Sequence, residues 1–137
     1  MHHWADPVAG LAELRRIARR RVVVLACDRR GGEGFWLTRD YIAENYAWDS
    51  TRFTPLEQIV EVLADGAGGG VRIEPVPVPH DCADGFLAAY WRRPAAYLDR
   101  QVRASMSNFA LPGAPPCEEG LARLAADVGY RLVIADF

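Results

Sequence analysis

The stretch VVVLAC at residues 22–27 decides which fold the sequence predicts. It is a short apolar run rich in β-branched residues, which is typical of a strand buried on both faces of a sheet. A helical pattern over residues 8–17 precedes it, with Asp6 as the N-cap and Pro7 at the first helical position. Because a helix leads into this strand and other helices follow it, the sequence predicts an α/β domain.

Two further stretches have the composition of strands. Residues 71–78 contain spaced β-branched residues that are interrupted by Pro75 and Pro77. Proline has no backbone N–H to donate, so we expect this strand at the edge of a sheet. Residues 130–135 read YRLVIA and form the last predicted strand.

Helices are predicted between these strands. Residues 35–46 carry apolar side chains at helical spacing. The motif TPLE at residues 54–57 has the residue types of a capping box and predicts the start of a second helix. The acidic pair at residues 118–119 favours the first turn of a third helix, because carboxylates are stabilised at a helix N-terminus.

The composition argues against several classes of protein. The chain has sixteen basic residues, all of them arginine, and eighteen acidic ones, a balance that argues against a nucleic-acid-binding face. Cys27, Cys82 and Cys117 lie far apart, so we expect no disulfide framework and a reducing, cytoplasmic location. No apolar run is long enough to span a membrane, and no signal-peptide pattern is visible.

Several segments follow one another in an order that carries a family resemblance. They are HHWADP at 2–7, GLAELRRIA at 10–18, VVVLACD at 22–28, PVPHDCADGF at 77–86 with the Tyr90-Trp91 pair, and GYRLVI at 129–134. Together they resemble the C-terminal half of the class I S-adenosylmethionine-dependent methyltransferases, in particular the UbiE-like or type 11 branch. The resemblance spans nearly the whole chain, so we expect residues 1–137 to be a single, partial methyltransferase domain.

The resemblance implies a topology and a reaction. The fold would be the C-terminal part of a Rossmann-like methyltransferase, with a small mixed sheet and flanking helices. In this sheet, residues 130–135 would be central and antiparallel to both 22–27 and the edge strand 71–78. The reaction would transfer a methyl group in line from S-adenosylmethionine, used as co-substrate without a metal, to a small-molecule acceptor of unknown identity. The glycine turn and the ribose-binding acid of the missing N-terminal half, which hold this donor, are absent.

Four residues are candidates for the reacting centre. By resemblance, His2, His3 and Trp4 would lie beside the methyl donor; the alternative is that they form a solvent-exposed N-terminus. His80 lies where a predicted strand ends, at the rim where open α/β sheets bind ligands. There it would act as general base toward the acceptor, and the alternative is an ordinary surface histidine.

A second group of residues could form the wall of an acceptor pocket. Its members are Trp36, Asp81, Phe86, Tyr90 and Trp91. The alternative for Asp81 is a helix N-cap, and the alternative for the aromatic residues is the hydrophobic core.

Other functions stay open from the sequence. The chain could be a non-catalytic methyltransferase-like fragment that folds by oligomerisation or with a partner. The motif GGEG at residues 31–34 stands between a predicted strand and a helix, as phosphate-binding loops do. It fits no standard phosphate-binding motif, which favours a flexible loop as the alternative. We also expect a homo-oligomer, because one edge of the strand at Val22–Cys27 would have no partner within the chain.

Overall fold

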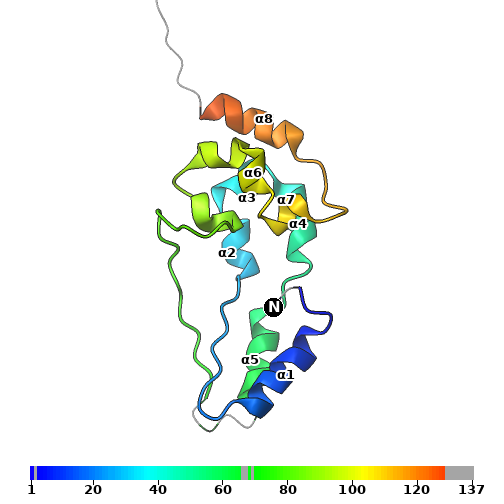
Figure 1. The fold of residues 1–137 in the computed structure, drawn as a ribbon, viewed down its shortest axis with the longest axis vertical. Helices are drawn as coiled ribbons and strands as arrows, with labels where there is room; N and C mark the ends of the chain where they lie inside the picture. The colour runs from blue at the N-terminus through cyan, green and yellow to red at the C-terminus, as the bar shows by residue number, and fades with distance from the viewer. Residues whose placement is uncertain (2, 66–67, 69, 129–137) are drawn as a thin grey trace, which may run out of the picture.

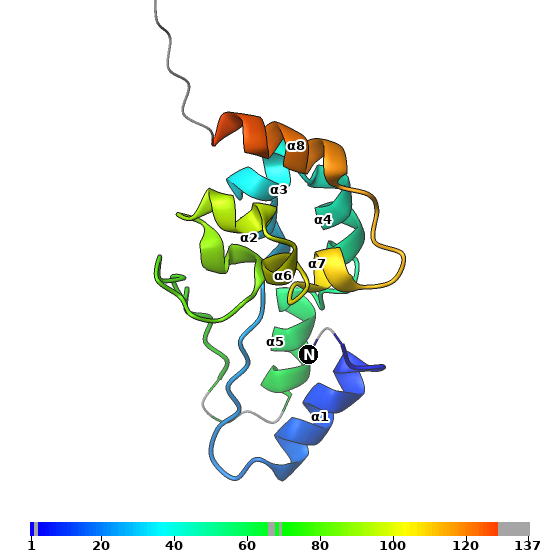
Figure 2. The ribbon, with the colours of Figure 1, turned by 45° about the horizontal axis from the view of Figure 1, so that its top comes forward.

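The computed structural model describes residues 1, 3–65, 68 and 70–128, which form helices joined by extended segments (Figures 1 and 2). The α-helices are α1 (Pro7–Ile17), α2 (Arg29–Glu33), α3 (Trp36–Asp40), α4 (Ala43–Ser50), α5 (Leu56–Ala64), α6 (Arg100–Arg103), α7 (Ser107–Ala110) and α8 (Glu118–Asp127). The 3-10 helices are η1 (Leu87–Tyr90) and η2 (Pro94–Leu98). Helices α1 and α5 lie together at one end, and we call them the helix pair. The other helices form a helical bundle (Figure 1).

The helix pair is held by apolar contact and by one arginine. Leu11 of α1 is fully buried, and Ile59 of α5 is 6% exposed. The guanidinium of Arg15 reaches across to the end of α5, where it donates to the Val62 carbonyl at 2.8 Å and pairs with Asp65 at 2.7 Å. Each fully buried leucine or isoleucine contributes about 1.5–3 kcal/mol, so the apolar contact outweighs the half-exposed ion pair.

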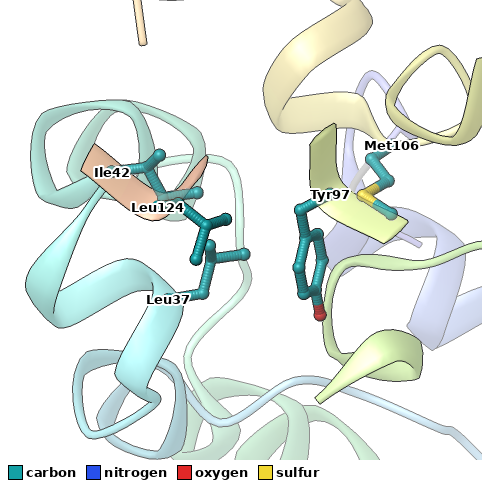
Figure 3. Packing of buried hydrophobic residues seen from close by; sticks show 5 residues of the cluster. All are labelled: Leu37, Ile42, Tyr97, Met106 and Leu124. Carbon is teal, nitrogen blue, oxygen red and sulfur yellow. The ribbon is translucent and has the colours of Figure 1, made fainter. Parts of the chain in front are cut away.

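The helical bundle has a hydrophobic core to which distant parts of the sequence contribute. Its buried members are Leu37, Ile42, Tyr97, Met106 and Leu124. Figure 3 shows Leu37, Ile42 and Leu124 on one side of this core and Tyr97 and Met106 on the other. Leu37 and Ile42 come from the region of α3 and α4, whereas the others come from η2, the start of α7 and α8. The core therefore joins two segments that are separated in sequence by the whole of α5.

The predicted mixed α/β sheet is wrong for the part of the chain that the structure describes, where no residue is in a strand. Residues 22–27 and 71–78 are extended, but no backbone hydrogen bond joins them to another described residue. A strand needs a neighbour for its N–H and C=O groups. The two segments form no backbone hydrogen bonds with each other. In one of them, Pro75 and Pro77 have no N–H to donate. The third predicted strand, residues 130–135, lies outside the described residues.

The predicted helices are confirmed in part. Helix α1 begins as expected, because Pro7 is its first residue and the Asp6 carboxylate accepts a hydrogen bond from the Ala9 N–H at 2.9 Å. Helix α8 begins at Glu118, also as expected. The single helix predicted over residues 35–46 is instead two helices, α3 and α4, which break where Ile42 turns its side chain into the core.

The capping box predicted at residues 54–57 is wrong. Helix α5 begins at Leu56, and no side chain caps its first turn. Thr54 is 8% exposed, so the residue expected to cap the helix is buried instead. Pro55, with φ −55° and ψ 141°, lies outside the helix and takes the N-cap position that the capping box would give to Thr54.

Gly120 sets how closely α8 approaches the rest of the bundle. It is buried, and a Cβ at this position would overlap the carbonyl carbon and oxygen of Tyr41. A backbone group cannot move aside as the end of a side chain can. The contact between α8 and the end of α3 is therefore available only to glycine, and it brings Leu124 into the core.

We expect Gly120→Ala to destabilise the chain, although alanine is normally the better helix former. Overpacking against backbone costs about 1–3 kcal/mol. The matched control is Ala125→Gly, on an exposed position of the same helix, which should cost only the helix-propensity difference of about 0.5–1 kcal/mol. Urea unfolding of both variants measures the difference, and an unchanged or higher stability of Gly120→Ala would contradict this packing.

Candidate functional site

The short helix α2 lies between two surface cavities and defines the candidate site. One cavity of about 280 Å³ lies where the extended segment 22–27 ends. Its lining residues are Cys27, Asp28, Arg29, Arg30, Glu33, Thr54, Pro55, Leu56 and Glu57. A second cavity of about 350 Å³ shares Arg29 and Glu33 with the first and extends toward α3 and α4. Two segments far apart in the sequence, the start of α2 and the start of α5, thus form the walls of one concave surface.

Charged side chains dominate the first cavity. Asp28 caps α2 by accepting a hydrogen bond from the Arg30 N–H at 3.0 Å. The Arg30 guanidinium lies 3.4 Å from both Asp28 and Glu57 and so bridges the two walls. These ion pairs are long and exposed, and such pairs are worth about 0–1 kcal/mol, so Arg30 can leave the bridge at little cost. A polar ligand could therefore take its place.

Helix α2 is fixed in position by Tyr46 and Thr38. The Tyr46 hydroxyl donates to the Arg29 carbonyl at 3.0 Å, and its ring fills the space that a side chain at Gly32 would need. The Thr38 hydroxyl donates to the carbonyls of Gly32 and Phe35. The motif GGEG at 31–34 therefore belongs to an anchored helical turn, and neither the phosphate-binding loop nor the flexible loop describes it.

Three of the predicted acceptor-binding residues come together. The Trp36 indole donates to the Trp91 carbonyl at 3.1 Å, and the rings of Trp36 and Tyr90 both pack edge-on against the ring of Tyr97. Tyr97 is fully buried. Trp36 and Tyr90 thus belong to the margin of the core, as their alternative interpretation had it, while Trp91 is 37% exposed.

His80, Asp81 and Phe86 lie on the surface. His80 and Asp81 are exposed in a turn that is closed by a hydrogen bond from the Cys82 N–H to the Pro79 carbonyl. This turn is tied to the bundle, since the Trp91 indole donates to the Val78 carbonyl at 3.0 Å. No helix begins at Asp81, so the N-cap alternative is wrong, and Phe86 is 42% exposed next to η1.

The predicted donor-binding residues lie apart from these. His3 and Trp4 are exposed before α1, and the Trp4 ring lies over Gly10 of that helix. His2 lies outside the described residues. Within the described ranges the structure therefore does not bring these residues to the aromatic group, which belongs to the bundle.

Sequence reasoning missed a buried polar group inside the bundle. The Asn45 amide donates to the Asn108 carbonyl at 2.5 Å, and the Asn108 amide donates to the side chain of Asn45 at 3.0 Å. Asp49, one turn after Asn45, is 2% exposed and accepts a hydrogen bond from Ser107 at 3.3 Å. The sequence did contain a signal for this group, because Asn45 and Asp49 are four residues apart and so lie on the same face of a helix. This group fixes α4 against α7.

The described residues contain neither a metal-binding cluster nor a membrane-spanning helix. Nowhere in 1, 3–65, 68 and 70–128 do three or more histidine, cysteine or acidic side chains gather as a metal ion would need. Over the same ranges, no helix is long and apolar enough to cross a membrane.

Comparison with known proteins gives one informative match. Neither a protein-family model nor a curated protein matches the chain. The crystal structure of a "Putative methyltransferase from antibiotic biosynthesis pathway" from Anabaena variabilis ATCC 29413 is 38% identical to it, with a TM-score of 0.77. The chain resembles a methyltransferase. The match covers 93% of this chain and 51% of the Anabaena chain, so the present chain spans about half the length of that methyltransferase structure.

We expect Gly32→Ala to destabilise the chain and Gly31→Ala to leave it unchanged or slightly more stable. A Cβ at Gly32 would meet the Tyr46 ring, whereas a Cβ at Gly31 would meet nothing within 4 Å. The expected loss for Gly32→Ala is about 1–3 kcal/mol. The expected gain for Gly31→Ala is at most about 1 kcal/mol, from the better helix propensity of alanine. Urea unfolding tests the pair, and equal stabilities would show that Tyr46 does not hold α2.

The stability of the chain should fall between about pH 10 and 12, and Tyr46→Phe should reduce the fall. Burial, helped by the negative charges of Cys27 and Glu33, raises the pKa of Tyr46 to about 12. In the unfolded chain the hydroxyl ionises near pH 10, so the stabilisation is complete below about pH 10 and is lost as the pH rises through the folded value. The pKa values of Tyr41 and Tyr97 are also raised above 10, so Tyr46→Phe should remove only part of the fall. Urea unfolding at a series of pH values measures it, and parallel curves for both proteins would contradict the assignment.

Proposed function

We propose that the chain is the acceptor-facing half of an S-adenosylmethionine-dependent methyltransferase of the UbiE-like or type 11 branch. The observation that carries the proposal is the match to the Anabaena methyltransferase structure, at 38% identity over 93% of this chain. Similarity at that level over nearly the whole chain supports a shared function as well as a shared fold. The wide spacing of its three free cysteines supports a reducing, cytoplasmic setting.

The residues of this chain do not by themselves fit the methyl donor. Class I enzymes hold it on a glycine turn that links a strand to a helix, with an acidic residue on the ribose. Here residues 31–34 read GGEG without the required spacing, and the glycines at 66–70 follow a helix. The lining of the first cavity beside α2 includes five charged residues, Asp28, Arg29, Arg30, Glu33 and Glu57. We therefore assign donor binding to a polypeptide region equivalent to the unmatched half of the Anabaena structure, and derive no reaction step from this chain alone.

The helical bundle is the part that we assign to the acceptor. Phe86 and Trp91, at 42% and 37% exposure, are the members of the predicted acceptor wall with the most aromatic surface available to a ligand. His80 and Asp81 lie in the turn that follows Val78, whose carbonyl accepts the hydrogen bond from Trp91. In this arrangement His80 would accept the proton that the acceptor loses, and the aromatic rings would exclude water.

We expect the isolated chain to bind S-adenosylmethionine with a dissociation constant above the millimolar range, corresponding to no more than about 4 kcal/mol. Titration calorimetry on the purified chain measures this. Micromolar binding by a clean monomer would show that the chain holds the donor unaided and that the assignment to a second half is wrong.

The function itself is tested by adding the unmatched half of the Anabaena protein to the chain and repeating the titration. Binding of S-adenosylmethionine by the two together that is at least tenfold tighter than binding by the added half alone supports the proposed function. An assembled pair that does not bind the donor would overturn it in favour of a non-catalytic role.

A further inference from the structure

Two extended segments run along the same side of the molecule between the helix pair and the bundle (Figures 1 and 2). They are residues 19–27 and 71–77, and we call them the extended surface. Its side chains include the most exposed large apolar residues of the described chain. Val23 is 83% exposed and Leu25 is 80% exposed, while Ile73 and Val76 are 62% and 66% exposed.

The backbone groups of the extended surface form no hydrogen bonds with other described residues. Among the described residues, no hydrogen bond reaches an N–H or C=O group of residues 19–27 or 71–77. The alternation in the first segment is regular, because Val22 and Val24 are half-buried while Val23 and Leu25 point outward. Extended backbone with free donors and acceptors, beside apolar side chains, is the chemistry that recognises another extended polypeptide.

We propose that the extended surface is the docking site for a polypeptide equivalent to the unmatched half of the Anabaena structure. The proposal rests on the proposed function for the identity of that half. The docked half would cover Val23 and Leu25 with apolar side chains and would pair its own extended backbone with residues 19–27.

The length of the relative favours this occupant over a second copy of the chain. In the Anabaena structure, the matched residues make up 51% of the chain, so a region of nearly equal size accompanies them in the same polypeptide. A second copy would bring only the same two segments, one of which carries Pro75 and Pro77 without N–H donors. Self-association through residues 22–27, which the sequence suggests, is therefore the competing outcome.

The experiment co-expresses the 137-residue chain with the unmatched half of the Anabaena protein and follows both by light scattering and amide hydrogen exchange. We expect a one-to-one complex in which the amides of residues 19–27 exchange at least tenfold more slowly than in the chain alone. The double variant Val23→Glu/Leu25→Glu should weaken the complex at least tenfold. Ala122→Glu, on an exposed face of α8, is the matched control and should leave it unchanged.

Each other outcome overturns the proposal. A homodimer whose amides at 19–27 are already protected would make a second copy the occupant. The absence of a complex would show that this half is not the occupant. A complex that the double variant does not weaken would place the docking site elsewhere. Because Val23 and Leu25 are exposed, circular dichroism should show the double variant folded as the parent is. Donor binding is measured separately, so a complex that forms without binding S-adenosylmethionine leaves the docking site standing and overturns only the proposed function.

Discussion

The close contact between Gly120 and the carbonyl of Tyr41 is the constraint on which the helical bundle depends. It lets α8 lie against the backbone at the end of α3, and this places Leu124 beside Leu37 and Ile42. Without that approach, the first half of the bundle would have no apolar cover on this side. A small number of buried side chains is enough for the bundle because each is almost completely removed from water.

The second constraint is the buried pair of amide side chains, Asn45 and Asn108. Asn45 and Asn108 form hydrogen bonds with each other inside the bundle. A buried amide without a hydrogen-bond partner would destabilise the fold by more than the hydrogen bond stabilises it. Tyr46, the next residue along α4, holds α2 from the other side. A single helix thus positions both the interior of the bundle and the wall of the candidate site, which explains why α4 carries so many buried polar residues.

The local signal at the start of α1 was interpreted correctly, the one at residues 54–57 was not, and the signals that depend on partners failed. Asp6 and Pro7 open α1 as predicted because a cap needs only neighbouring residues. Residues 22–27 were predicted as a buried strand on composition, yet a strand exists only through its neighbours, and the described chain offers it none. The candidate site followed the same division. Trp36 and Tyr90, both predicted as members of an acceptor wall, pack against Tyr97 at the margin of the core. The role of Gly32 depends on Tyr46, a contact that no local pattern reveals.

The way the chain passes three times between the helix pair and the bundle has a consequence for how such proteins diversify. The bundle is encoded by two separate blocks, residues 29–50 and 87–127, with α5 between them. Its core is shared by both blocks, since Leu37 packs with Leu124 across the gap. Recombination that exchanged one block alone would join mismatched halves of a core, so we expect the two blocks to be inherited as a unit. Under the proposed function, variation in acceptor preference would then arise by substitution on the surface of the bundle, around Phe86 and Trp91, and seldom by exchange of modules.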